Sequence, residues 1–116
     1  MNDVPSSETT VDSHGSVARI NGAMDYLTQP WVRERLRQVI AGADRFVILE
    51  LTGVSFCDSA GLSVLLWARG EAEAHGVVLV LACVPATLRC VLQMTGADQV
   101  LRVFDTVVDA QGFLGG

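Results

Sequence analysis

The chain has 116 residues, of which 50% are hydrophobic and 18% are charged, so it can fold into a single domain and is not disordered throughout. Its net charge of −5 at pH 7 argues against direct binding to the phosphate backbone of a nucleic acid. All eight basic residues are arginine, and the absence of lysine excludes chemistries that need an amine, such as a P-loop lysine or a Schiff base.

The N-terminal segment and the cysteines bear on the cell compartment. Residues 1–10 are polar and have neither the basic nor the apolar region of a signal peptide, so we expect a flexible leader over 1–10 and one domain over 11–116. The longest apolar run, Val77–Pro85, has nine residues, whereas a membrane-spanning helix needs about 20. The three cysteines show no C-x-x-C spacing, which indicates no zinc site. The sequence therefore predicts a cytoplasmic protein with no membrane association, no metal and no cofactor.

Two strands and a helix are predicted in the first part of the chain. Strand-like segments at Glu8–Asp12 and Val17–Asn21 flank turn-forming residues at 13–16, which together predict a hairpin. Gly22–Leu27 is predicted as a loop. A helix then starts at Thr28 and runs to about Ala41, because apolar residues recur there at helical spacing.

The middle of the chain is predicted as a buried strand, a loop and a helix. Phe46–Leu51 is almost continuously apolar, which is typical of a parallel strand buried on both faces. Glu50 is the exception, and we expect it near the strand end with a partner, because a buried carboxylate is costly when unpaired. Thr52–Asp58 is predicted as a loop, and the next helix should run to about His75, where Gly76 ends it.

The remainder continues the alternation of strands and helices. Val77–Ala82 is predicted as a strand, Pro85 opens a helix that Gly96 ends, and Leu101–Phe104 forms a short last strand before a terminal helix that runs to about Phe113. The resulting order is β-β-α-β-α-β-α-β-α. It predicts a single α/β domain with a mixed, mostly parallel sheet and helices packed on it.

The segment Asp58–Leu62 carries the candidate chemistry. Function in α/β sheets tends to lie in the loops at the carboxyl ends of strands, and this segment follows such a loop. Asp58 is a favourable N-cap, which places Ser59 in the first helical turn, near unpaired backbone N–H groups and the positive end of the helix dipole. Gly61 has no side chain, so another molecule can approach closely there.

The residues alone leave three interpretations of Ser59 open. It can merely belong to the start of a helix. It can be the nucleophile of a serine hydrolase, although the first glycine of the G-x-S-x-G elbow is absent. That role also needs a base near Ser59, and neither histidine can supply it. His75 is expected roughly 24 Å from Ser59 along the same helix. His14 is expected a strand length from Ser59, on the order of 17 Å.

The third interpretation makes Ser59 a phosphorylation site. A phosphoserine adds nearly two negative charges, which a helix N-terminus tolerates, so the fold should survive the modification. A docked partner, however, would have to bury an unpaired charge. A penalty of roughly 4 kcal/mol corresponds to about a thousandfold in affinity, which suffices for a switch without conformational change.

Three separated segments of the chain resemble the STAS domain family of anti-sigma factor antagonists. That family's signature is an apolar strand, a short loop and then Asp-Ser-Ser/Thr/Ala-Gly-Leu, and it is matched here by Phe46–Leu51, Val54–Cys57 and Asp58–Leu62. Gly22–Asp25 is similar to its Gly-Glu-Leu-Asp, and Val91–Gly96 to its helix ending in Leu-Thr-Gly. The likeness covers residues 15–110 in matching order and spacing, and it implies a STAS-like fold.

The resemblance also implies a function and a set of partners. The unphosphorylated protein would bind an anti-sigma factor and thereby free a sigma factor, which regulates transcription. The anti-sigma factor of this family is commonly a serine kinase that uses ATP, and a phosphatase reverses its action. Carried over, Ser59 is the phosphate acceptor. The partner-facing residues would lie in the loop before the first long helix and at the start of the second: Asp25, Thr28, Asp58, Ala60, Gly61, Leu62 and Ser63.

The chain departs from the family pattern at several positions. Ala23 replaces a usual glutamate and removes a carboxylate from the expected docking loop. Ala60 replaces a hydroxyl residue, which leaves the motif serine as the main acceptor ahead of Ser55 and Ser63. Cys57 beside the motif is unusual; we expect it to serve packing, with a redox input as the alternative.

Two further alternatives concern function. The resemblance also allows a non-switching STAS scaffold or an accessory subunit of a lipid-transport or stress-sensing complex. A receiver-type aspartyl phosphate at Asp58 would need a lysine, which this chain lacks.

Overall fold

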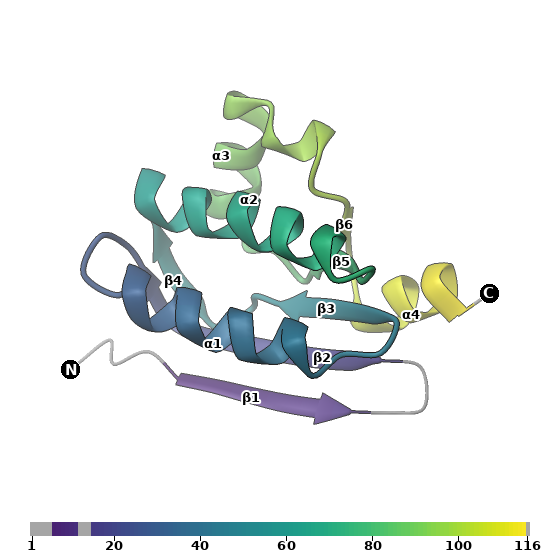
Figure 1. Ribbon diagram of the computed structural model, residues 1–116. Coiled ribbons are helices and arrows are strands. Elements are labelled where there is room, and N and C mark those ends of the chain that lie inside the picture. Colours follow the sequence, from purple (N-terminus) through teal and green to yellow (C-terminus); the bar gives the residue numbers. More distant parts are fainter. Residues whose placement is uncertain (1–5, 12–14, 116) are drawn as a thin grey trace.

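The fold is a six-stranded mixed sheet that carries helices on both faces, seen in a computed structural model that describes residues 6–11 and 15–115 (Figure 1). Five strands follow the spatial order β1-β2-β3-β5-β6, and β4 pairs with β2 off that path. The strands are β1 (Ser6–Val11), β2 (Ser16–Met24), β3 (Phe46–Glu50), β4 (Val54–Cys57), β5 (Val78–Ala82) and β6 (Val103–Phe104). The helices are α1 (Gln29–Ala41), α2 (Ser59–Ala74), α3 (Ala86–Thr95), the short 3₁₀ helix η1 (Ala97–Gln99) and α4 (Val107–Gly115).

The predicted N-terminal hairpin is confirmed, and it begins earlier than expected. β1 runs antiparallel to β2, with Ser6 opposite Asn21 and Val11 opposite Ser16. The prediction of a flexible leader is therefore wrong for residues 6–10, whose backbone pairs with β2. Residues 1–5, and residues 12–14 of the predicted turn, lie outside the described residues.

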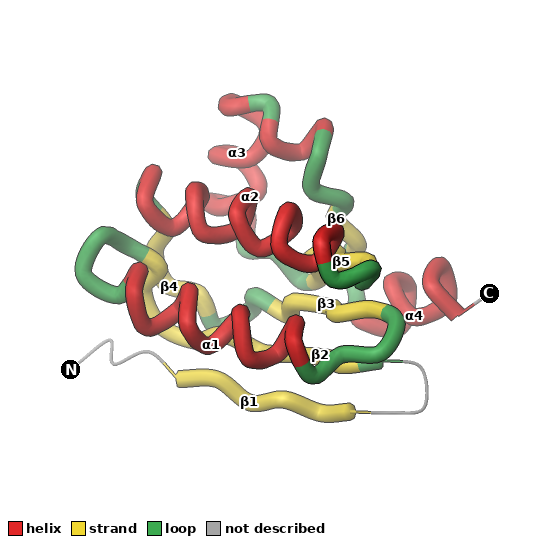
Figure 2. Tube along the Cα trace, in the orientation of Figure 1, coloured by secondary structure: helices red, strands yellow, loops and turns green. Residues whose placement is uncertain are grey.

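Successive side chains of β3 point to opposite faces of the sheet, and both faces are apolar, which explains the continuous apolar run of the sequence. Val47 and Leu49 join the larger core cluster with residues of α1 and α2, whereas Phe46 and Ile48 join a smaller cluster with Ala110 of α4. Both faces of this central strand are covered, so every residue of β3 is buried. Figure 2 shows α1 and α2 side by side over the strands, with α4 apart from them.

Glu50 lies at the end of β3 with partners, as predicted. Its carboxylate accepts hydrogen bonds from the backbone N–H of Thr52 at 3.0 Å and from the Thr52 hydroxyl at 3.0 Å. Arg19 on the neighbouring β2 approaches the same carboxylate at 3.4 Å. These contacts offset the cost of placing a carboxylate in the core.

The main correction to the predicted element order is an additional strand. Val54–Cys57, predicted as part of a loop, forms β4 and pairs in parallel with the end of β2, which extends to Met24 instead of stopping at Asn21. The observed order is therefore β-β-α-β-β-α-β-α-β-α, with η1 after α3. Helix ends at Gly76 and Gly96 agree with the prediction, since both glycines have positive φ angles of 72° and 78°.

Candidate functional site

Strand β4 brings the predicted site residues together. Its pairing sets Ala23 opposite Phe56 and Met24 opposite Cys57. The loop after β2, residues 25–28, consequently lies beside Asp58, where α2 begins. The additional strand thus places two segments that are far apart in sequence at one edge of the molecule (Figure 1).

The side chain of Asp58 connects the two segments. One carboxylate oxygen accepts hydrogen bonds from the backbone N–H groups of Ala60 at 2.9 Å and Gly61 at 3.1 Å. The other oxygen accepts from the backbone N–H of Tyr26 at 3.3 Å. The predicted N-cap is confirmed, and the same side chain also holds the loop after β2 against α2.

Asp25 and Thr28 face their own loop. One Asp25 carboxylate oxygen accepts from the backbone N–H groups of Leu27 at 2.9 Å and Thr28 at 3.0 Å. The Thr28 hydroxyl accepts from the Asp25 N–H at 3.0 Å and donates to the Ala23 carbonyl at 2.7 Å. These two predicted partner-binding residues therefore set the shape of the loop, and they leave Tyr26 and Leu27 75% and 84% exposed.

Ser59 is exposed as the first residue of α2. Its hydroxyl makes no hydrogen bond with any other residue that the structure describes. Ala60 is half-buried and Ser63 is exposed. His75 caps the opposite end of α2, where its Nδ1 lies 3.0 Å from the Glu71 carbonyl oxygen.

Gly61 and Leu62 lie behind the surface. Both are buried, and a Cβ atom built on Gly61 would meet the carbonyl oxygen of Met24 and lie 2.8 Å from the Cys57 sulfur. The sequence predicts that Gly61 lets another molecule approach, but the space is filled by the chain's own β2 and β4. In the free protein Gly61 and Leu62 therefore pack beneath the exposed surface of the site.

Cys57 is packed between the strand and the helix. Its Sγ lies 3.6 Å from the Asp58 carbonyl oxygen. Burial, followed by the charge of Asp58, raises the pKa of the Cys57 thiol to about 11. The thiol is therefore protonated at neutral pH and is a poor nucleophile.

Sequence reasoning missed the exposed apolar residues of the two segments that meet at Asp58. Phe56 is 54% exposed on β4, and Tyr26 and Leu27 project from the loop that Asp58 holds. We call Tyr26, Leu27, Phe56 and Ser59 the Ser59 face. A signal was present in the sequence, because large apolar residues occur there in segments predicted as loops.

Within the described residues, no helix has the length and apolarity to cross a membrane. The same residues contain no group of three or more His, Cys, Asp or Glu side chains that could hold a metal ion.

Comparisons with known proteins agree with this architecture. The family model described as STAS domain matches residues 6–110. The anti-sigma-F factor antagonist RsfB of Mycobacterium tuberculosis is 29% identical over 103 residues, which cover 87% of this chain and 84% of that protein.

Two solved structures show the same fold. An anti-sigma factor antagonist from Mycobacterium paratuberculosis is 24% identical, with a TM-score of 0.83 over 100% of this chain and 98% of that chain. The Bacillus cell fate determinant SpoIIAA, in its phosphorylated form, is 26% identical, with a TM-score of 0.66 over 92% of this chain and 96% of that one. The predicted fold is thus confirmed, and because the family model spans most of its length, the chain belongs to the STAS domain family.

Proposed function

We propose that this protein is an anti-sigma factor antagonist whose binding to an anti-sigma factor is controlled by phosphorylation of Ser59. The observation that carries the proposal is the Ser59 face: Ser59 is exposed at the start of α2, and the adjacent Asp58 binds the loop that exposes Tyr26 and Leu27. The relatives RsfB and SpoIIAA support it, since the first is named an anti-sigma-F factor antagonist and the second is known in a phosphorylated form.

Docking would bury the apolar side chains of the Ser59 face. Tyr26, Leu27 and Phe56 are all more than half exposed in the free protein, and aromatic anchors of this kind commonly dominate binding energy in interfaces. The loop that carries Tyr26 is held in place by Asp25, Thr28 and Asp58. A loop shaped in advance loses little conformational freedom on binding, which favours affinity.

A phosphate on Ser59 would remain unneutralised. The backbone N–H groups of Ala60 and Gly61, which could otherwise bind a phosphate, are already used by the Asp58 carboxylate. The helix dipole makes the added charge tolerable in water, but docking would strip the water away. An uncompensated buried charge costs several kcal/mol, and about 4 kcal/mol corresponds to about a thousandfold loss of affinity.

The resemblance to the STAS domain family suggests the partners of this scheme. The anti-sigma factor would itself act as the serine kinase, using ATP, and a phosphatase would restore the binding form. All of these reactions would take place in the cytoplasm. In this role the protein is a substrate and a binding module, not an enzyme.

Phosphorylation is tested with a purified anti-sigma factor that has serine kinase activity. Incubation with ATP should add one phosphate, which mass spectrometry should map to Ser59 and which should be absent in Ser59→Ala. Ser63→Ala is the matched control, because Ser63 is also exposed near the start of α2. Mapping of the phosphate to Ser55 or Ser63 would contradict the assignment.

Binding is tested by calorimetry with the same anti-sigma factor. Ser59→Glu should weaken binding by at least about tenfold, or 1.4 kcal/mol, whereas Ser63→Glu should have a smaller effect. Phe56→Ala should weaken binding without changing the fold, because this side chain is 54% exposed. Unchanged binding by Ser59→Glu would reject the switch and favour the non-switching scaffold.

A further inference from the structure

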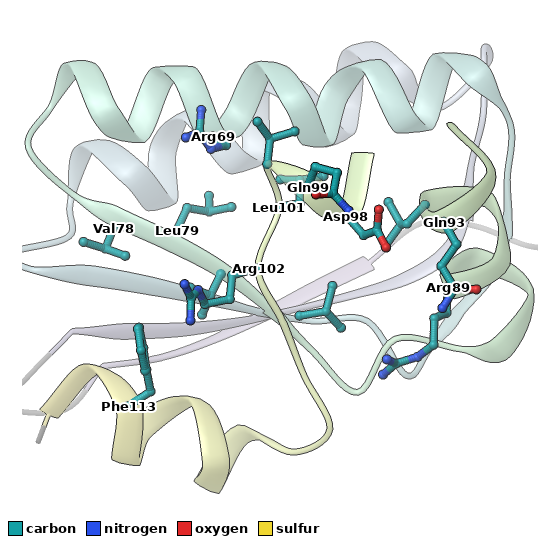
Figure 3. A pocket seen from close by; sticks show the side chains of 14 residues that line it. Arg69, Val78, Leu79, Arg89, Gln93, Asp98, Gln99, Leu101, Arg102 and Phe113 are labelled. Atoms are coloured by element: carbon teal, nitrogen blue, oxygen red, sulfur yellow. The ribbon is translucent and has the colours of Figure 1, made fainter. Parts of the chain in front are cut away.

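A cavity of about 650 Å³ opens at the β6 edge of the sheet (Figure 3), and no residue of the Ser59 face lines it. Its walls include Arg69 of α2, Arg89 of α3 and Arg102 from the segment before β6. Three of the eight arginines of an acidic chain therefore line one site. Arg69 lies ten residues beyond Ser59 on the same helix, which corresponds to about 15 Å, so the two surfaces are separate.

The three guanidinium groups keep hydrogen-bonding capacity for a ligand. Arg69 approaches Glu73 at 3.7 Å and Arg89 approaches Asp105 at 3.4 Å, in each case with a largely exposed carboxylate. Surface pairs of this kind contribute about 0–1 kcal/mol. Arg102 lies over the ring of Phe113 at 4.6 Å, and no carboxylate of the described residues pairs with it.

The cavity also contains an open strand edge. β6 pairs with Leu81 and Ala82 of β5, and the Cys83 N–H donates to the Phe104 carbonyl at 3.1 Å. Toward the start of β5, the last hydrogen bond of this ladder runs from the Leu81 N–H to the Arg102 carbonyl at 2.9 Å. In a parallel strand, the backbone groups of alternate residues form hydrogen bonds with the neighbouring strand on the same side. The backbone of Leu79 therefore points to the same side of β5 as that of Leu81, but within the described residues no strand pairs with Leu79 on that side.

Exposed apolar side chains lie along the same edge. Val78 is 51% exposed and Phe113 is 53% exposed, and both line the cavity. Arginine and aromatic residues around an apolar strand are typical of a protein interface, and an open strand edge binds extended peptides through main-chain hydrogen bonds.

We propose that this surface binds an extended acidic segment of a partner protein. The segment would add a short strand beside Val78–Val80 and place its carboxylates on Arg69, Arg89 and Arg102. These arginines come from α2, α3 and the segment before β6, which suits charges spaced along a chain better than one compact anion. The proposal does not depend on phosphorylation of Ser59.

The test uses the full-length protein and a fluorescein-labelled octapeptide of alternating glutamate and valine, followed by fluorescence anisotropy at low ionic strength. Arg89→Gln and Arg102→Gln should each weaken binding by about tenfold, the effect of losing one charge-assisted hydrogen bond. Arg37→Gln is the matched control, because Arg37 is exposed on α1, outside the cavity. It removes the same charge and should leave binding within about twofold of the unmodified protein.

Two altered peptides separate the contributions of charge and backbone. Replacement of glutamate by glutamine, and methylation of alternate backbone nitrogens, should each weaken binding by about tenfold. Full binding by the methylated peptide would reject strand addition, and equal weakening in Arg37→Gln would reject the site. Displacement of the peptide by an equal concentration of inorganic phosphate would show that a small anion is the occupant. No measurable binding by the unmodified protein would also overturn the proposal.

Discussion

Gly61 shows how closely the start of α2 packs against β2. A Cβ atom at this position would meet the Met24 carbonyl oxygen and lie 2.8 Å from the Cys57 sulfur. We expect Gly61→Ala to lower the free energy of unfolding by about 1–3 kcal/mol, because the cost of overpacking exceeds the gain in helix propensity. Urea-induced unfolding measures the difference.

Gly70 provides the control within the same helix. A Cβ atom there would meet nothing within 4 Å, and the residue is exposed. Gly70→Ala should therefore raise the free energy of unfolding by about 0.5–1 kcal/mol. A stabilising effect at both glycines would show that the close approach of Met24 does not constrain α2.

The thiol of Cys57 should lose its proton only at high pH. The pKa of its thiol is raised from 9.0 to about 11, chiefly by burial, so the folded protein holds this proton to a higher pH than the unfolded chain does. The associated stability is present at neutral pH and is lost as the pH rises from about 9 to about 11. Cys57→Ala should remove that part of the pH dependence of unfolding.

Alkylation distinguishes packing from a redox role for Cys57. At pH 8 iodoacetamide should modify Cys57 more slowly than Cys90, which is exposed. Mass spectrometry of the labelled peptides assigns each rate. Labelling of Cys57 as fast as that of Cys90 at this pH would contradict a packing role and support a redox role for Cys57.

At the scale of elements, α4 closes the second face of the sheet. Ala110 is fully buried against Phe46, Ile48 and Val80, whereas Val108 on the same helix is 74% exposed. Ala110→Asp should destabilise the protein by about 3 kcal/mol or more, because it places an unpaired carboxylate in this core. Val108→Asp should cost less than about 0.5 kcal/mol, and equal effects in thermal unfolding would contradict this account of the helix.

Elements with strong local signals were predictable from the sequence. The apolar run of β3 and the glycines that end α2 and α3 gave correct strands and helix ends. β4 was missed because it has only four residues and a single buried one, Val54. The end of β2 was missed because Gly22, which reads as a loop residue, is accommodated by a register shift opposite β4. Both errors concern pairing between distant segments, which a local pattern does not show.

The candidate site was predictable to a similar degree. Asp58 as a cap and Ser59 in the first helical turn followed from the motif, whereas the close packing of Gly61 depends on its tertiary contacts with Met24 and Cys57. The bond from the Tyr26 N–H to Asp58 joins residues 32 positions apart. No helix-capping rule includes such a contact.

At the scale of the whole molecule, two surfaces of different chemistry lie on different parts of one domain. The Ser59 face combines exposed apolar side chains with a serine, and the β6 edge combines arginines with an open strand. The proposed partners would therefore not compete for the same residues. The small size of the domain, with a radius of gyration of 12.9 Å, still leaves room for both.

The Asp58 side chain forms hydrogen bonds both with the start of α2 and with the loop after β2. This arrangement has a consequence for how a kinase selects its substrate. Under the proposed function, the enzyme that modifies Ser59 meets a three-dimensional epitope assembled from two distant parts of the chain, not a linear consensus sequence. A peptide copied from residues 54–64 would contain the serine but not the neighbouring loop. Newly made chains would become substrates of the kinase only after folding. Phosphorylation would therefore act only on molecules that are folded and able to bind the anti-sigma factor.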